Sequence, residues 1–150
     1  MNESKKDKEN SMEDVFGPLI YGYTRAQAIA DGVLVDVANT AKEAGIRIPT
    51  AITAAVHARY VQVPDELKGM QDEAGRLWDA LFMLAHAIRS GKLNGDQGTF
   101  ELIVVMPEGA DWQPNERRHG HQQRLVTLKA VCGPNDDGSA CITILMLEED

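Results

Sequence analysis

The sequence predicts an α+β protein, with about four helices followed by a three-stranded antiparallel sheet that ends in a C-terminal hairpin. Apolar residues recur at helical spacing up to about residue 90, and β-rich runs with alternating polarity follow them. Helices that precede strands along the chain are typical of α+β domains. The chain has 150 residues, of which 43% are hydrophobic, so it is long enough to bury the core of one domain.

Three short helices are expected before residue 70. The first covers residues 25–30 and begins after Thr24, which is a good N-cap. The second covers residues 34–44, although its opening sequence VLVDV also suits a strand. The third covers residues 51–60, where Thr50 serves as the N-cap.

The longest helix is expected over residues 71–90, and it is predicted to form the centre of the core. Its apolar residues follow the i, i+3, i+4, i+7 pattern over four turns. Trp78 falls within this pattern, and Phe82 and Met83 widen the predicted core face. Acidic residues in the first turn and Arg89 in the last turn suit the helix dipole.

The apolar period changes to two after residue 98, which predicts three strands. The first covers residues 99–106, and residues 124–132 and 140–147 form a hairpin around the turn GPNDDGS. The hairpin gathers its apolar side chains on one face when the numbers of paired residues have an even sum. The predicted register sets Leu128 opposite Ile144.

The N-terminal sequence and the cysteines favour a cytoplasmic protein. Residues 1–14 are polar and charged and lack the apolar segment of a secretory signal, so we expect a disordered tail before a single domain over residues 15–150. No apolar run reaches the roughly 18 residues that span a bilayer, so no membrane is expected as a partner. Cys132 and Cys141 fall on opposite faces of the predicted hairpin and are expected to stay reduced.

The sequence contains no specific catalytic motif, and we expect no cofactor. It has neither a phosphate-binding loop nor a nucleophile elbow. His119 and His121 form the one close pair of histidines, and Asp111 or Glu116 nearby could complete a metal site. A solvated polar loop is the favoured interpretation, because the sequence holds no second close pair of ligands. A small metal-binding protein or enzyme that uses His119 and His121 is the alternative.

Acidic charge gathers in two segments of the chain. The formal net charge is −8, which argues against direct binding of nucleic acid. Residues 64–79 and 130–150 are both acidic, and such a surface fits the basic groove of a partner protein, although solubility alone would also account for it. The predicted partner-binding residues are Asp72, Glu73, Asp79, Asp136, Asp137, Glu148, Glu149 and Asp150.

Three phrases of the sequence occur together in order: YTRAQAIADGVLVDV, QDEAGRLWDALFMLAHAIR, and RLVTLKAVCGPNDDG followed by ITILM. They resemble an uncharacterised family of small proteins encoded by bacterial phages, plasmids and other mobile elements. The resemblance runs from about Phe16 to the C-terminus and implies no catalytic residues. It implies an accessory gene, of a kind that often encodes inhibitors of host defence or regulators of the element.

The charge and the resemblance together favour a non-catalytic protein that binds and inhibits a host protein. The expected target is a nucleic-acid-handling defence complex of the CRISPR or restriction type, held through acidic surface. The alternative is a homodimeric regulatory module of the mobile element, in which a sheet edge and the segment FGPLIYGY pair across a two-fold axis.

Overall fold

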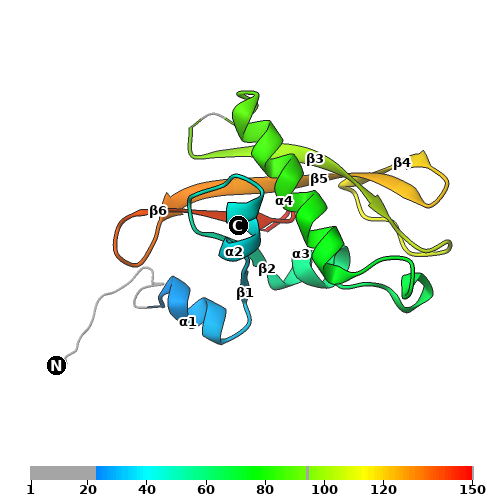
Figure 1. Ribbon diagram of the computed structural model, residues 1–150, viewed down its shortest axis with the longest axis horizontal. Coiled ribbons are helices and arrows are strands. Elements are labelled where there is room, and N and C mark those ends of the chain that lie inside the picture. The colour runs from blue at the N-terminus through cyan, green and yellow to red at the C-terminus, as the bar shows by residue number, and fades with distance from the viewer. Residues whose placement is uncertain (1–22, 94, 150) are drawn as a thin grey trace.

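The computed structural model describes residues 23–93 and 95–149 and confirms the α+β class (Figure 1). The predicted tail over residues 1–14 and all but the last residue of FGPLIYGY lie outside these residues, as does Asp150. Among the helices described, none has the length and apolar character that crossing a bilayer requires.

The sheet corrects the sequence prediction, because it is mixed and has six strands instead of three antiparallel ones. The order is β1-β2-β6-β5-β3, and β4 pairs with β5 beside this path. The pair β2–β6 is parallel and the other pairs are antiparallel. The strands are β1 (Leu34–Asp36), β2 (Thr50–Thr53), β3 (Gln97–Val105), β4 (Glu116–Gly120), β5 (Gln123–Pro134) and β6 (Ala140–Leu145).

Strand β2 replaces the first turn of the helix predicted over residues 51–60. All four of its residues are buried, because it lies between β1 and β6 and both of its faces are covered. A strand buried on both faces has no polar alternation, so its sequence TAIT gave no strand signal. The chain becomes helical only at α3 (Ala54–Val56) and continues into the π-helical turn η2 (His57–Val61).

The first predicted helix has the predicted bounds, whereas the second is shorter than its apolar pattern suggested. Helix α1 (Arg25–Ala30) begins at a capping box, in which Thr24 Oγ1 accepts from the Gln27 amide and Gln27 Oε1 accepts from the Thr24 amide. The VLVDV segment contains β1, so the strand interpretation of that segment is correct. Helix α2 (Ala38–Glu43) follows it.

The long helix is confirmed as α4 (Glu73–Arg89), which follows the 3₁₀ turn η3 (Asp65–Leu67). Its N-cap is Asp72, whose carboxylate accepts a 2.7 Å hydrogen bond from the Gly75 amide. The prediction that Trp78 and Phe82 face the core is wrong, since both are exposed. The sheet contacts only one side of α4, and that side is filled by small and branched residues, such as Ala80, Leu81, Leu84 and Ala85.

The hairpin β5–β6 has the predicted faces but not the predicted register. Ile144 pairs with Ala130, two residues along β5 from the predicted partner Leu128. A shift of two residues leaves every side chain on the same face, so the pattern of apolar residues cannot distinguish the two registers. Cys132 and Cys141 are free thiols, as predicted.

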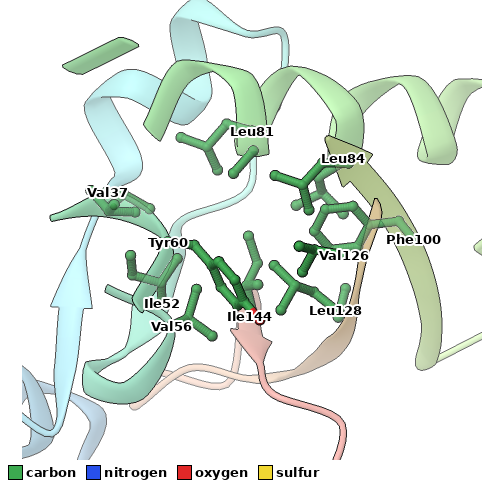
Figure 2. Close-up of a cluster of buried hydrophobic side chains, with 14 of the residues drawn as sticks. Val37, Ile52, Val56, Tyr60, Leu81, Leu84, Phe100, Val126, Leu128 and Ile144 are labelled. Carbon is green, nitrogen blue, oxygen red and sulfur yellow. The ribbon is translucent and has the colours of Figure 1, made fainter. Parts of the chain in front are cut away.

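One hydrophobic core joins α2, α4 and η2 to one face of the sheet. Figure 2 shows Leu81 and Leu84 pointing from α4 toward the sheet residue Ile144 and toward Tyr60. Helix α1 reaches the opposite face, because Arg25 Nη1 donates a 2.7 Å hydrogen bond to Thr143 Oγ1, and Thr143 alternates with the core residues of β6. The side of α4 that faces away from the sheet carries exposed residues, among them Trp78 and Phe82.

Candidate functional site

An aromatic pair lies on the outer face of α4. Trp78 and Phe82 stand one turn apart, with exposed fractions of 37% and 45%. Their ring centroids are 6.0 Å apart and the rings are stacked at 29°. Because residues at i and i+4 share one face of a helix, the two rings form one continuous apolar patch on the surface.

One of the predicted partner-binding carboxylates, Asp79, lies beside this aromatic pair, and two others, Asp72 and Glu73, lie at the N-terminal start of the same helix. Asp79 lies three positions before Phe82 on the same outer face. Partial burial raises the pKa of Asp79, and the neighbouring charge of Arg76 opposes that rise. Asp72 caps the helix, and Glu73 lies in its first turn with its carboxylate 3.9 Å from His57 Nε2.

The exposed surface near the start of α4 is more acidic than the count of charged residues in the sequence indicates, because the side chain of one nearby cation, Arg76, is buried. Arg76 is only 5% exposed. Its guanidinium donates to the carbonyl oxygens of Tyr60 and Val105 at 3.0 and 2.9 Å, and so ties α4 to η2 and β3. Lys68 is paired at 2.9 Å with the carboxylate of Asp65. We name the exposed surface of α4 that carries Trp78, Asp79 and Phe82, together with Asp72 and Glu73 at the N-terminal end of the helix, the α4 face.

The other predicted acidic residues lie apart from the α4 face. Figure 1 places the β5–β6 turn at one end of the long axis and the first turn of α4 toward the other end. In that turn Asp136 accepts hydrogen bonds of 2.8 and 3.0 Å from the amides of Arg25 and Ala26 at the start of α1. Asp137 accepts from the amide of Ser139 at 3.0 Å. Both carboxylates thus accept hydrogen bonds from backbone amides, which stabilises the β5–β6 turn and the start of α1.

The acidic residues near the C-terminus differ in how far they are exposed to solvent. Glu148 is exposed, whereas Glu149 is half-buried. The Glu149 carboxylate accepts from the hydroxyl of Thr53 and from the amide of Met146, each at 2.8 Å, so it fixes the end of the chain against β2. Asp150 lies outside the described residues.

The histidine pair lies in and just after β4. Within residues 23–93 and 95–149, no group of three His, Cys, Asp or Glu side chains is arranged to hold a metal ion. Glu116, which the sequence offered as a third ligand for His119 and His121, is engaged elsewhere. Its side chain is fully buried and accepts hydrogen bonds from Arg59 and Arg124 at 2.6 and 2.9 Å.

Glu116 is the centre of a buried ionic network that sequence reasoning missed. Burial would raise the pKa of Glu116, but hydrogen bonds from Arg59, Tyr60 and Arg124 lower it to about 2. The Tyr60 hydroxyl donates to the carboxylate, and Asn115 Nδ2 donates to that hydroxyl at 3.1 Å. Burial and the contact with Glu116 raise the pKa of Tyr60. The carboxylate already has several donors, so the network holds η2 to β4 and β5 rather than a ligand.

No local sequence signal pointed to this network, because Arg59 and Tyr60 lie more than fifty residues before Glu116. Arg59 and Glu116 belong to η2 and β4, and only the folded chain brings them together. The Tyr60 carbonyl on the same turn accepts from Arg76, so the network also supports the base of α4. The network thus helps to position α4, and with it the α4 face, without being part of that face.

No family model, curated protein or solved structure matches the chain. The likeness to small proteins of mobile elements therefore stays a prediction from the three quoted phrases. The candidate site rests on the geometry of the α4 face itself.

Proposed function

We propose that this protein is a non-catalytic binding protein that docks on a basic surface of a partner protein through the α4 face. The observation that carries the proposal is the exposed Trp78–Phe82 stack with the carboxylate of Asp79 beside it. Trp is enriched among residues that dominate binding energy at interfaces, and carboxylates at the rim select the charge of the partner.

The aromatic pair supports binding rather than solubility. A soluble surface requires no large aromatic side chains, and two adjacent exposed rings add apolar area that water solvates poorly. Stacking already holds the rings in one arrangement, so docking would cost little side-chain entropy. The core residues on the inner side of α4 keep the helix rigid behind them.

The charge supports a basic partner. The chain has a net charge of −8, and the burial of Arg76 leaves the carboxylate of Asp79 beside the rings and those of Asp72 and Glu73 at the start of the helix. A basic surface would be attracted during encounter, because Arg76 is buried and Arg89, the other arginine of α4, lies in the last turn of the helix. Proteins that handle nucleic acid commonly present such basic surfaces.

We further propose that the partner is a host protein of the bacterial cytoplasm, in a nucleic-acid-handling defence complex, and that the chain is the product of a mobile element. The acidic α4 face supports the class of partner, and the likeness of the three sequence phrases supports the mobile element. Inhibition would follow from occupation of the basic groove that otherwise takes nucleic acid.

The experiment is a tagged pull-down from bacterial host lysate treated with nuclease, followed by a binding titration with the captured protein. We expect Trp78→Ala and Phe82→Ala each to weaken the affinity by about tenfold or more, as for interface anchors. Asp79→Lys is expected to slow association, with the largest effect at low salt. Ile103→Ala is the matched control, because Ile103 is similarly exposed, at 44%, but lies on β3. Equal capture by all four variants would contradict docking through the α4 face.

A homodimer is the second candidate, and the free edge of β3 favours it. Within the described chain β3 is nine residues long and pairs with β5 alone, so its other edge offers unpaired backbone groups. Light scattering separates the candidates. A dimer that persists in Trp78→Ala but is lost when Pro replaces Glu101 on β3 would favour the regulatory module over the host inhibitor.

A further inference from the structure

A small apolar pocket lies between the C-terminal half of α4 and the sheet, away from the aromatic pair of the α4 face. Its volume is about 160 Å³. Its walls come from α4, from the segment that leads into β3, and from β5 and β6, and they include Leu84, Ile88, Leu93, Ala130, Cys132 and Ile142. The pocket is therefore built from the same layers as the core.

The pocket has a buried floor and an accessible mouth. Leu84 is fully buried, and Ala130 and Ile142 are each 6% exposed. At the mouth Ile48 and Ile88 are 36% and 40% exposed, so apolar surface continues from the core out to solvent. The space is an unfilled extension of the core that remains accessible from outside.

Water is a poor occupant of such a space. An ordered water needs two to four polar partners, and the walls are mainly aliphatic. An apolar molecule of matching size would displace that water and restore dispersion contacts with the floor. Cavities of about 150 Å³ with similar apolar walls accept benzene, which sets the scale at roughly one six-membered ring.

The charge of the walls selects among ligands of this size. Among the described residues that line the pocket, Asp96 is the one with a carboxylate, and none is Lys, Arg or His. Asp96 is exposed, so its charge lies near solvent rather than in the floor. A ligand with an anionic group would be repelled, whereas a neutral ligand or one with an amine would not.

We propose that this pocket is a binding site for a small apolar molecule of about one six-membered ring, either neutral or bearing an amine. The site is independent of the α4 face. Gly98 supports it structurally, because a Cβ there would lie 2.4 Å from the Leu93 side chain that forms one wall.

The test is a titration of the full chain with three matched probes: benzyl alcohol, benzylamine and benzoate, followed by amide chemical shifts in NMR spectra. We expect saturable shifts at Gly98 and Ala130 with the alcohol and the amine, and binding of benzoate weaker by about tenfold or more. Alkylation of Cys132 by iodoacetamide should slow when either binding probe is present. Absence of saturable shifts with all three probes would overturn the proposal, as would equal binding of benzoate.

Three variants check that the shifts report this pocket. Cys132→Leu adds volume within the walls and is expected to abolish binding, whereas Cys132→Ala leaves the space open and is expected to retain it. Ile88→Glu places a charge at the exposed mouth, where it does not disturb the core, and is expected to weaken binding of the alcohol at least about tenfold. Unchanged binding in Cys132→Leu and Ile88→Glu would overturn the assignment.

Discussion

At the scale of single residues, Glu116 is the side chain that joins β4 and β5 to η2. Its side chain is fully buried between two arginines and a tyrosine hydroxyl. A buried carboxylate without hydrogen-bond donors would strongly destabilise the folded state, so Glu116 can be buried here only because Arg59, Tyr60 and Arg124 donate to it. Removal of the charge would leave Arg59 and Arg124 without their shared counter-ion.

We expect the folded state to lose stability as the pH falls from about 4.5 to 2, because the folded pKa of Glu116 is about 2 and lies below its ordinary value. The unfolded chain then binds the proton first, so a contribution of about 3 kcal/mol, present above the unfolded pKa, is lost on acidification. Urea unfolding at several pH values measures this. Glu116→Gln should lower stability at neutral pH by about 3–5 kcal/mol and flatten the acid slope.

Glu108→Gln is the control for that measurement, because Glu108 is an exposed carboxylate on the preceding loop. It should leave stability at neutral pH within about 0.5 kcal/mol of the parent protein. The same acid slope in Glu116→Gln and in the parent protein would show that other carboxylates control the acid transition.

At the scale of elements, α1 depends on a turn more than one hundred residues away. The six residues of α1 are too few to be stable as an isolated helix. Asp136 accepts from the first amides of α1, and Arg25 donates to β6 in return. The β5–β6 turn therefore acts as the N-terminal support of α1.

Asp136→Ala is expected to release α1 from the sheet. The two amides would lose their acceptor, with a cost to stability of about 1 kcal/mol, similar to the loss of an N-cap. Hydrogen exchange at Arg25 and Ala26 should accelerate, whereas Asp137→Ala, the neighbour that contacts only its own turn, should leave those two amides protected. Protected amides at Arg25 and Ala26 in Asp136→Ala would contradict the support of α1 by this turn.

The same elements show what the sequence could and could not predict. Helix α4 was predictable because its apolar pattern extends over four turns, and α1 because Thr24 and Gln27 form a local capping box. The carboxylates of the α4 face were also predicted, but the exposed rings were not. The pattern of apolar residues cannot reveal that Trp78 lies beyond the edge of the buried side, because that edge depends on where the sheet lies.

Strands gave less information than helices for physical reasons. Strand β2 has no alternation, since it is buried on both faces. Strand β4 reads ERRHG, and its charged side chains hide a strand whose first residue, Glu116, is buried by arginines from elsewhere. Neither the sheet order nor the ionic network is encoded in a local segment.

At the scale of the whole molecule, one core cluster includes residues from α2, α4, η2 and four strands of the sheet. No described element is large enough to retain a core of its own when this cluster is lost. The protein should therefore unfold as a single cooperative unit.

The two tryptophans test this cooperativity, because Trp78 lies on α4 and Trp112 contacts the ionic network, with Arg124 Cζ 3.7 Å above its ring. In Trp78→Phe and Trp112→Phe the remaining tryptophan reports one region alone. We expect both fluorescence transitions in urea to coincide with the loss of helical circular dichroism. Separate midpoints would identify the β4 side as an independent unit.

The parallel pair β2–β6 also sets the order in which the chain is completed during synthesis. Thr50 pairs with Ile142, so about ninety residues must emerge from the ribosome before β2 acquires its second neighbour. Until then β2 has one of its two neighbours in the sheet and α1 lacks the turn that supports it, and closure of so long a loop is slow. The nascent chain thus stays open to proteases and chaperones until its last strand is translated.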